Sequence, residues 1–132
     1  MPLKLTLKPG ERVIIAGAVL TNGPGVAHLR VENRVPLLRQ KDILTESEAT
    51  TPCKKIYFVI QLMYIGSGLT TELAQLYWDI VRDVLNAAPS TNDLISQISA
   101  YIVDSNFYQA LKTAKKLISY EEELVNHVSK PG

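Results

Sequence analysis

The sequence predicts an α+β fold, in which a small antiparallel β-sheet module at the N-terminus packs on a C-terminal bundle of about four α-helices. Residues 1–44 alternate apolar and polar side chains between turns that contain Pro and Gly, whereas residues 45–132 repeat apolar side chains at helical spacing. The charge changes at the same point. Residues 1–44 hold seven Lys and Arg against three Asp and Glu, a net charge of +4, and residues 45–132 hold seven against ten, a net charge of −3. We therefore expect a basic β module over 1–44 and an acidic helical module over 45–132, which fold as one compact unit.

Short strands account for the N-terminal module. Alternation over 3–8 and 27–32 predicts two half-buried strands, a further strand is expected over 12–15, and three to five strands are expected in all. Pro9-Gly10 suits the centre of a type II turn, because Pro fixes φ and Gly accepts a positive φ. Gly17 indicates a bulge or a bend, and a Gly-Pro-Gly segment reverses the chain before the last strand. The strands are expected to form one small sheet with a polar, basic face.

Amphipathic helices account for the rest of the chain. Thr45 and Glu48 have the spacing of a capping box, and a Pro that suits the first helical position follows Thr51. Apolar spacing places Leu76 on the inner side of the second helix and Val125 on the inner side of the fourth. The four helices are expected over about 52–65, over about 71–87, after a cap at 90–93, and from a cap at 104 or 105 to about 128.

The residue patterns that metal and catalytic sites need do not occur. The chain has two His and one Cys without ligand spacing, and it has no Gly-rich phosphate loop and no nucleophile elbow. Glu121, Glu122 and Glu123 point in different directions on a helix, so we expect a solvated face rather than a cation site. The sequence therefore predicts a protein that is not an enzyme and that has no cofactor and no metal.

Composition indicates a soluble cytoplasmic protein. With 46% hydrophobic residues the chain can form a core, but no apolar run reaches the ~18–20 residues of a membrane helix. The first residues lack the apolar stretch of a secretory signal. The single cysteine, Cys53, excludes an internal disulfide and fits a reducing compartment. A position at a helix start can lower the pKa of a thiol, but we expect a structural role for Cys53.

The positive charge of the β module makes this module a candidate RNA surface, because the phosphate backbone is bound by Lys and Arg. The module lacks the paired aromatics and the GxxG loop of common RNA-binding modules. Arg34, Arg39 and Lys41 have a second interpretation, in which they pair with the acidic helices. The candidates for RNA binding in this module are Lys4, Lys8, Arg12, Arg30 and Arg34.

A lysine stripe is predicted on the last helix. Lys112, Lys115 and Lys116 share one face at helical spacing, and Tyr108 lies one turn earlier. The lysines can contact phosphates while the tyrosine ring stacks on a base. The alternative interpretation is an exposed face that only keeps the helix soluble.

A second basic group lies at the start of the first helix. Lys54 and Lys55 precede Tyr57 and Phe58, and single-stranded RNA sites combine basic and aromatic residues in this way. The alternative is that the aromatic rings are part of the core and that the lysines point outward.

Three segments carry a family resemblance: MPLKLTLKPGERVIIAGAVLTN, LRQKDILTESEATTPCKKIYFVIQLMYIG and YQALKTAKKLISYEEELV. In this order and at these spacings they resemble the FlbT family of flagellin-synthesis regulators. The most specific parts are the Leu-Lys-Pro-Gly-Glu-Arg opening, the Ile-Leu-Thr-Glu junction and the helix that follows it. The resemblance is weaker through residues 68–106.

This resemblance implies a cytoplasmic bacterial protein that controls flagellin production after transcription. Members of the family are associated with the 5′ untranslated region of flagellin messenger RNA, and they affect its stability and translation. The effect is repression in some lineages and promotion in others. A small flagellar protein, FlaF, is the usual functional counterpart. The family supplies no residue-level RNA site, so the candidate residues above rest on charge and aromatic placement.

Two functional hypotheses follow. In the first, the protein binds the flagellin leader RNA directly and changes the access of ribosomes or nucleases. In the second, it is a protein-interaction adaptor, whose helices bind flagellin, FlaF or the translation machinery, and its effects on RNA are indirect. Exposed sheet edges and apolar helix residues are also compatible with a homodimer.

Overall fold

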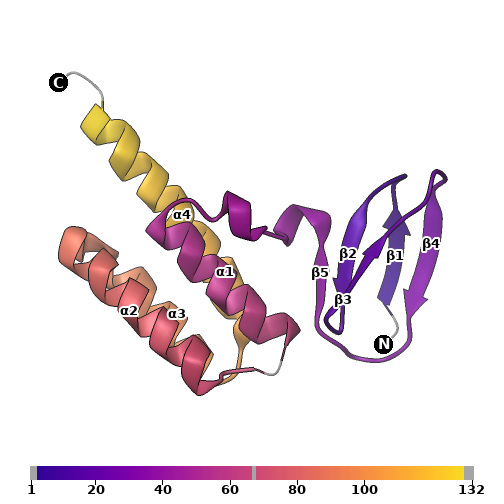
Figure 1. Ribbon diagram of the computed structural model, residues 1–132, viewed down its shortest axis with the longest axis horizontal. Coiled ribbons are helices and arrows are strands. Elements are labelled where there is room, and N and C mark those ends of the chain that lie inside the picture. The colour runs from indigo at the N-terminus through magenta and orange to yellow at the C-terminus, as the bar shows by residue number, and fades with distance from the viewer. Residues whose placement is uncertain (1–2, 67, 130–132) are drawn as a thin grey trace. The chain divides into compact units, whose positions relative to one another are not determined.

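The computed structural model describes residues 3–66 and 68–129 of the 132-residue chain, and these form five strands followed by four helices (Figure 1). The α+β class predicted from the sequence is confirmed. The chain divides into two compact units, residues 1–43 and residues 44–132, which we call the β unit and the helical unit.

The strands of the β unit form two antiparallel sheets, not the single sheet expected from the sequence. One sheet pairs β1 (Leu3–Leu7) with β4 (Ala27–Val31), and the other has the order β3 (Ala18–Thr21), β2 (Arg12–Ile15), β5 (Leu37–Arg39). Strand β4 pairs with β1 and not with its predecessor β3, so the segment between β3 and β4 carries the chain from one sheet to the other.

The core of the β unit comes from the alternating residues of β1 and β2. Leu5, Leu7 and Val13 are at most 3% exposed, and Ile15 and Val31 pack against them among other apolar side chains. Since side chains alternate across a strand, burial of Leu5 and Leu7 turns the polar residues of β1 outward.

Two turns fix the strand pairing. The type II turn predicted at Pro9-Gly10 is confirmed, because Glu11 N–H donates to the Lys8 carbonyl at 3.0 Å and Gly10 has φ +73°. The bulge considered at Gly17 is instead the second residue of a two-residue hairpin, in which Ala16 and Gly17 both have positive φ.

The helical unit contains α1 (Pro52–Ile65), α2 (Thr71–Ala87), α3 (Asn92–Val103) and α4 (Phe107–Ser129), so the four predicted helices are confirmed. Helix α4 packs on α1 and α3, and α2 packs on α1. The buried amide of Gln61 donates to the Leu44 carbonyl and accepts from the Leu44 N–H, both at 2.9 Å. This pair of hydrogen bonds holds the segment before α1 against that helix.

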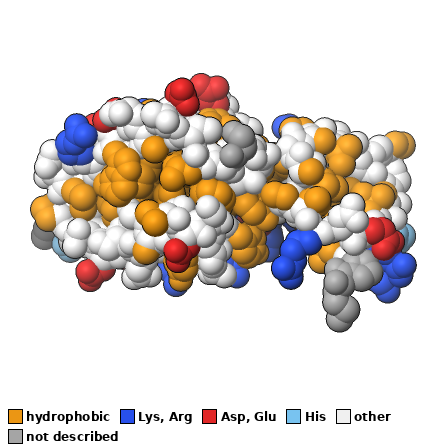
Figure 2. Space-filling model, turned by 90° about the horizontal axis from the view of Figure 1, so that it is seen from below, with side chains coloured by type: hydrophobic (Ala, Val, Ile, Leu, Met, Phe, Trp, Pro, Cys, Tyr) orange, Lys and Arg blue, Asp and Glu red, His pale blue; other side chains and the backbone are white. Residues whose placement is uncertain are grey.

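Two side chains predicted to be inward are exposed. Leu76 lies about 100° around the axis of α2 from the buried Tyr77, and it is 46% exposed. Val125, near the end of α4, is 59% exposed. Hydrophobic side chains accordingly gather on the surface of the helical unit in Figure 2.

A carboxylate from the last helix caps the first one. Glu121 accepts hydrogen bonds from the Thr51 hydroxyl and, at 3.1 Å, from the backbone N–H of Cys53, and Thr51 Oγ1 in turn accepts from the Lys54 N–H. The first N–H groups of a helix have no partner within the helix, and a negative charge is favourable there. The expectation of a solvated glutamate run is therefore wrong for Glu121, whereas Glu122 and Glu123 are exposed.

Replacement of the capping carboxylate should destabilise the helical unit. We expect Glu121→Ala to lower the free energy of unfolding by about 1–3 kcal/mol, because charge-assisted hydrogen bonds are lost and helix-end N–H groups are left unpaired. The matched control is Glu123→Ala, which removes the same side chain from an exposed position of the same helix. Equal unfolding midpoints for the two variants in urea denaturation would contradict the capping role.

Candidate nucleic-acid interface

Two cations face each other on the outer side of the β1–β4 sheet. The antiparallel register places Lys4 opposite Arg30 and Thr6 opposite His28, and all four side chains are exposed. Like charges directly opposite each other in a sheet are destabilising. Arg30 lies 3.8 Å from the exposed carboxylate of Glu32, which offsets only part of this repulsion. An anionic ligand on this face would therefore be favoured.

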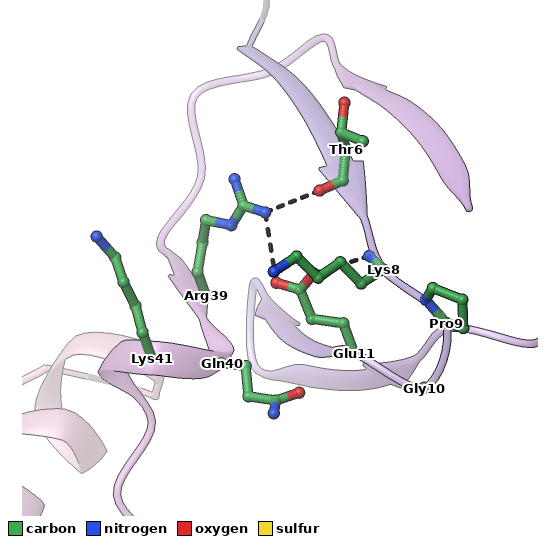
Figure 3. Close-up of a pocket in the computed structure, with 8 residues that line it drawn as sticks. All are labelled: Thr6, Lys8, Pro9, Gly10, Glu11, Arg39, Gln40 and Lys41. Atoms are coloured by element: carbon green, nitrogen blue, oxygen red, sulfur yellow. Dashed lines mark hydrogen bonds and ion pairs between the residues drawn. The ribbon is translucent and has the colours of Figure 1, made fainter. Parts of the chain in front are cut away.

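A polar pocket of about 680 Å³ adjoins this face (Figure 3). It lies where the β1–β2 turn meets the end of β5 and the short 3-10 turn Gln40–Asp42. Three of its residues are cationic and one is anionic. We call it the basic pocket, and it is lined by Thr6, Lys8, Pro9, Gly10, Glu11, Arg39, Gln40 and Lys41.

Arg39 connects the two sheets at this pocket. From β5 its Nη2 donates to the Thr6 carbonyl of β1 at 2.9 Å and to Glu11 Oε2 at 3.3 Å. Glu11 Oε1 also accepts the Lys8 backbone N–H at 2.9 Å, and this bond, followed by the bond from Arg39, lowers the pKa of the Glu11 carboxyl. The interpretation in which Arg39 pairs with an acidic helix is wrong, because its guanidinium is engaged within the β unit.

The paired cations and the basic pocket both lie along β1 and share Thr6. Lys4, Thr6 and Lys8 are exposed alternate residues, so they follow one side of the strand over about 14 Å. Thr6 belongs to both parts, because its hydroxyl lies 3.3 Å from His28 Nδ1 and it also lines the pocket. We call this surface, from the Lys4–Arg30 pair to the pocket, the basic strip.

The two other arginines predicted in the β unit differ in position. Arg12 lies beside the pocket, since its backbone N–H donates to Gln40 Oε1 at 2.7 Å, and its side chain is exposed. Arg34 is exposed in the connection between β4 and β5, outside the residues that line the pocket.

The lysine stripe of α4 has the expected exposure, and one of its lysines lies over the aromatic ring. Lys112, Lys115 and Lys116 are all exposed, and Tyr108 is 43% exposed. The Lys112 ammonium lies 5.1 Å from the centroid of the Tyr108 ring, and the Tyr64 ring lies beside it at 6.1 Å. Since the cation occupies one face of the ring, a base that stacks on that face has to displace Lys112.

The basic group at the start of α1 does not present a stacking platform. Tyr57 is 3% exposed, while Phe58 and Lys54 are half-buried and Lys55 is exposed. A base cannot reach the Tyr57 ring without a rearrangement of the core. For Tyr57 and Lys55 the alternative interpretation fits, in which the aromatic ring is part of the core and the lysine points outward.

The remaining sequence features give no chemical site. Burial, together with the Glu121 carboxylate, raises the pKa of the Cys53 thiol to about 12, so the lowered pKa considered for this cysteine is wrong. Within residues 3–66 and 68–129, no three His, Cys, Asp or Glu side chains are arranged to hold a metal ion. In the same residues, no helix has the length and apolarity needed to cross a membrane.

Of the eight residues that line the basic pocket, Lys8 was predicted as a candidate for RNA binding, and the role of Arg39 and Lys41 was left open. Glu11 and Gln40 were not candidates, and Thr6, Pro9 and Gly10 were expected only as strand and turn residues. Two segments that are far apart in the sequence form the pocket. The hydrogen bond from the Arg12 N–H to Gln40 Oε1, for example, joins residues that are 28 positions apart. The available signal was the Lys-Pro-Gly-Glu-Arg segment, a polar turn that follows β1 and has two cations against one anion.

Alkaline pH should destabilise the fold through two buried groups. Burial also raises the pKa of Tyr77 to about 12, although a hydrogen bond with Ser99 opposes the shift. A raised pKa in the folded state means that the unfolded chain loses its proton first, so stability falls as pH rises from about 9 to about 12. The expected slope is about 1.4 kcal/mol per pH unit for each group.

The pH dependence can be measured by urea denaturation between pH 8 and pH 12. Cys53→Ala and Tyr77→Phe each remove one titrating group, so each should flatten the decline in unfolding free energy above pH 9. A native thiol that ionises near pH 8.5, as in an unfolded chain, would contradict this assignment.

Comparison with known proteins gives one consistent family. The sequence profile described as "Flagellar protein FlbT" matches residues 3–125. The "Probable flagellum biosynthesis repressor protein FlbT 1" of Bradyrhizobium diazoefficiens is 44% identical over 94% of the chain and 85% of the relative. The "Flagellum biosynthesis repressor protein FlbT" of Caulobacter vibrioides is 35% identical over 98% of the chain and 93% of the relative. No solved structure matches the chain.

Proposed function

The chain belongs to the FlbT family of flagellar proteins, and on this basis we propose that it regulates flagellin synthesis by binding the 5′ untranslated region of flagellin messenger RNA. Its relatives are named as repressors of flagellum biosynthesis, and repression is the direction we propose here. The binding site is the basic strip. The protein acts in the cytoplasm, where the messenger is translated, and it performs no chemistry of its own.

The observation that carries this proposal is the Lys4–Arg30 pair. The register of β1 and β4 holds two cations directly opposite each other on an exposed face. Such a pair costs stability in the free protein, and a phosphate backbone that lies along the strip would remove the repulsion. Binding to phosphates fixes the position of the protein on the RNA, while sequence preference requires contacts to bases.

Occupation of the leader is sufficient for regulation. A protein bound there excludes the ribosome or a nuclease from the same nucleotides, so translation or decay of the messenger changes. Because cations along the strip replace counterions of the RNA, the affinity should fall steeply as salt concentration rises.

An adaptor role is the second candidate, and the apolar surface of the helical unit favours it. Leu76 and Trp78 of α2 are almost half exposed, and Val103 at the end of α3 is 74% exposed. Hydrophobic side chains group together on this unit in Figure 2, and exposed apolar patches often bind other proteins. Flagellin, FlaF or the translation machinery would be the partner, and the effects on RNA would be indirect.

Substitution of one strip lysine separates RNA binding from folding. Lys4→Glu places an anion opposite Arg30, so the cross-strand pair becomes attractive and the β unit should gain about 0.2–1 kcal/mol. The same change should weaken binding of a flagellin leader RNA and reduce the slope of log K against log salt by about 0.7. Thermal denaturation and filter binding between 50 and 300 mM salt measure the two effects.

The control for this experiment is the triple variant Lys112→Glu, Lys115→Glu, Lys116→Glu, which reverses the stripe on α4. If the basic strip is the RNA surface, this variant changes the salt slope less than Lys4→Glu does. Equal binding by Lys4→Glu and wild-type protein, or a wild-type protein that does not bind the leader, would favour the adaptor role.

A further inference from the structure

We propose that the basic pocket binds a single phosphate group, supplied by a phosphodiester of unpaired RNA. The source of the phosphate rests on the function proposed above, whereas the phosphate chemistry rests on the pocket alone. The pocket lies at one end of the basic strip, and Thr6, which lines it, is the next residue on the same side of β1 after Lys4. It would thus fix one point of the RNA backbone, and the RNA would continue from this point along β1.

The charge of the pocket favours an anion. Among the described residues that line the pocket, Glu11 is the one carboxylate, and its two oxygens accept from the Lys8 N–H and from Arg39. Arg39 offsets the charge of Glu11. The ammonium groups of Lys8 and Lys41 then give these lining residues a net positive charge. The pocket therefore presents a net positive charge to a ligand.

Two side chains that line the pocket are held in position by hydrogen bonds within the β unit. Arg39 uses Nη2 for the Thr6 carbonyl and for Glu11, and Figure 3 shows its other terminal nitrogen directed away from Glu11. Gln40 accepts the Arg12 N–H with Oε1, which leaves its amide NH₂ group to donate. A phosphate accepts several hydrogen bonds, and charge-assisted bonds to Arg and Lys are the strong ones.

The β1–β2 turn leaves room for a ligand to approach the backbone. Gly10 has φ +73°, and a side chain built at this position would meet no atom within 4 Å. The volume of about 680 Å³ exceeds what one phosphate needs, so the sugars on either side can also enter. This shape suits a phosphate within a polymer.

The smallest probe of this chemistry is the dinucleotide UpU, which has one phosphodiester. In ¹H–¹⁵N spectra of the full chain, UpU should shift the amide signals of Gly10, Gln40 and Lys41, and uridine, which lacks the phosphate, should leave them unchanged. Lys41→Gln should weaken UpU binding about fivefold, the typical effect of one lost hydrogen bond. Arg82→Gln, which removes one charge from an exposed position on α2, should not change it.

Two results would overturn the proposal: equal shifts with uridine and UpU, which would indicate a base site, and UpU binding that is unaffected by Lys41→Gln. Inorganic phosphate is the third probe. If it shifts the three amides at a lower concentration than UpU does, the pocket binds free phosphate and the RNA source is wrong.

Leader RNA separates this proposal from the proposed function. If wild-type protein and Lys41→Gln bind the leader equally well, the pocket assignment fails and the regulatory function stands. If UpU shifts the pocket amides but the leader binds no better than a scrambled RNA, the proposed function fails and the phosphate pocket stands.

Discussion

The guanidinium of Arg39 is the interaction on which the candidate interface depends. It lies at the end of β5, in the three-stranded sheet, and it reaches the Thr6 carbonyl of β1, in the other sheet, and the carboxylate of Glu11 in the turn between β1 and β2. One side chain therefore brings together the segments that line the basic pocket (Figure 3). Both acceptors are held by the two hydrogens of one nitrogen, Nη2, and the guanidinium has further N–H donors beside it.

The helical unit is held by a comparable contact between distant residues. Glu121 of α4 caps the N-terminus of α1 by accepting the backbone N–H of Cys53, which lies 68 positions earlier in the sequence. The same carboxylate helps to raise the pKa of the Cys53 thiol. These contacts use polar groups that would otherwise be unpaired inside the unit. Apolar side chains are exposed on α2 and α3, and cations are exposed on β1 and β4. On this basis we propose that the β unit binds RNA and that the helical unit is the surface for protein partners.

The sequence was sufficient for local structure and insufficient for contacts between distant segments. Helices α1 and α2 begin and end at the predicted residues, because Thr51, Pro52 and the helical spacing are local signals. The split into two sheets was missed, since the alternation of Ala27–Val31 is the same whichever strand it pairs with. The partner of Arg39 stayed open for the same reason, because Glu11 lies 28 positions away. Helical spacing likewise showed that three glutamates point in different directions, but not that Glu121 would face a helix end.

The most direct test of this account is an amide hydrogen-exchange footprint of the full chain with and without flagellin leader RNA. If the basic strip is the RNA surface, the added protection should fall on residues 4–11, 27–31 and 39–41, and it should disappear when salt concentration is raised. The amides of α4 around Lys112–Lys116 should exchange at the same rate in both samples. Protection confined to α4, or no protection at any salt concentration, would contradict the account.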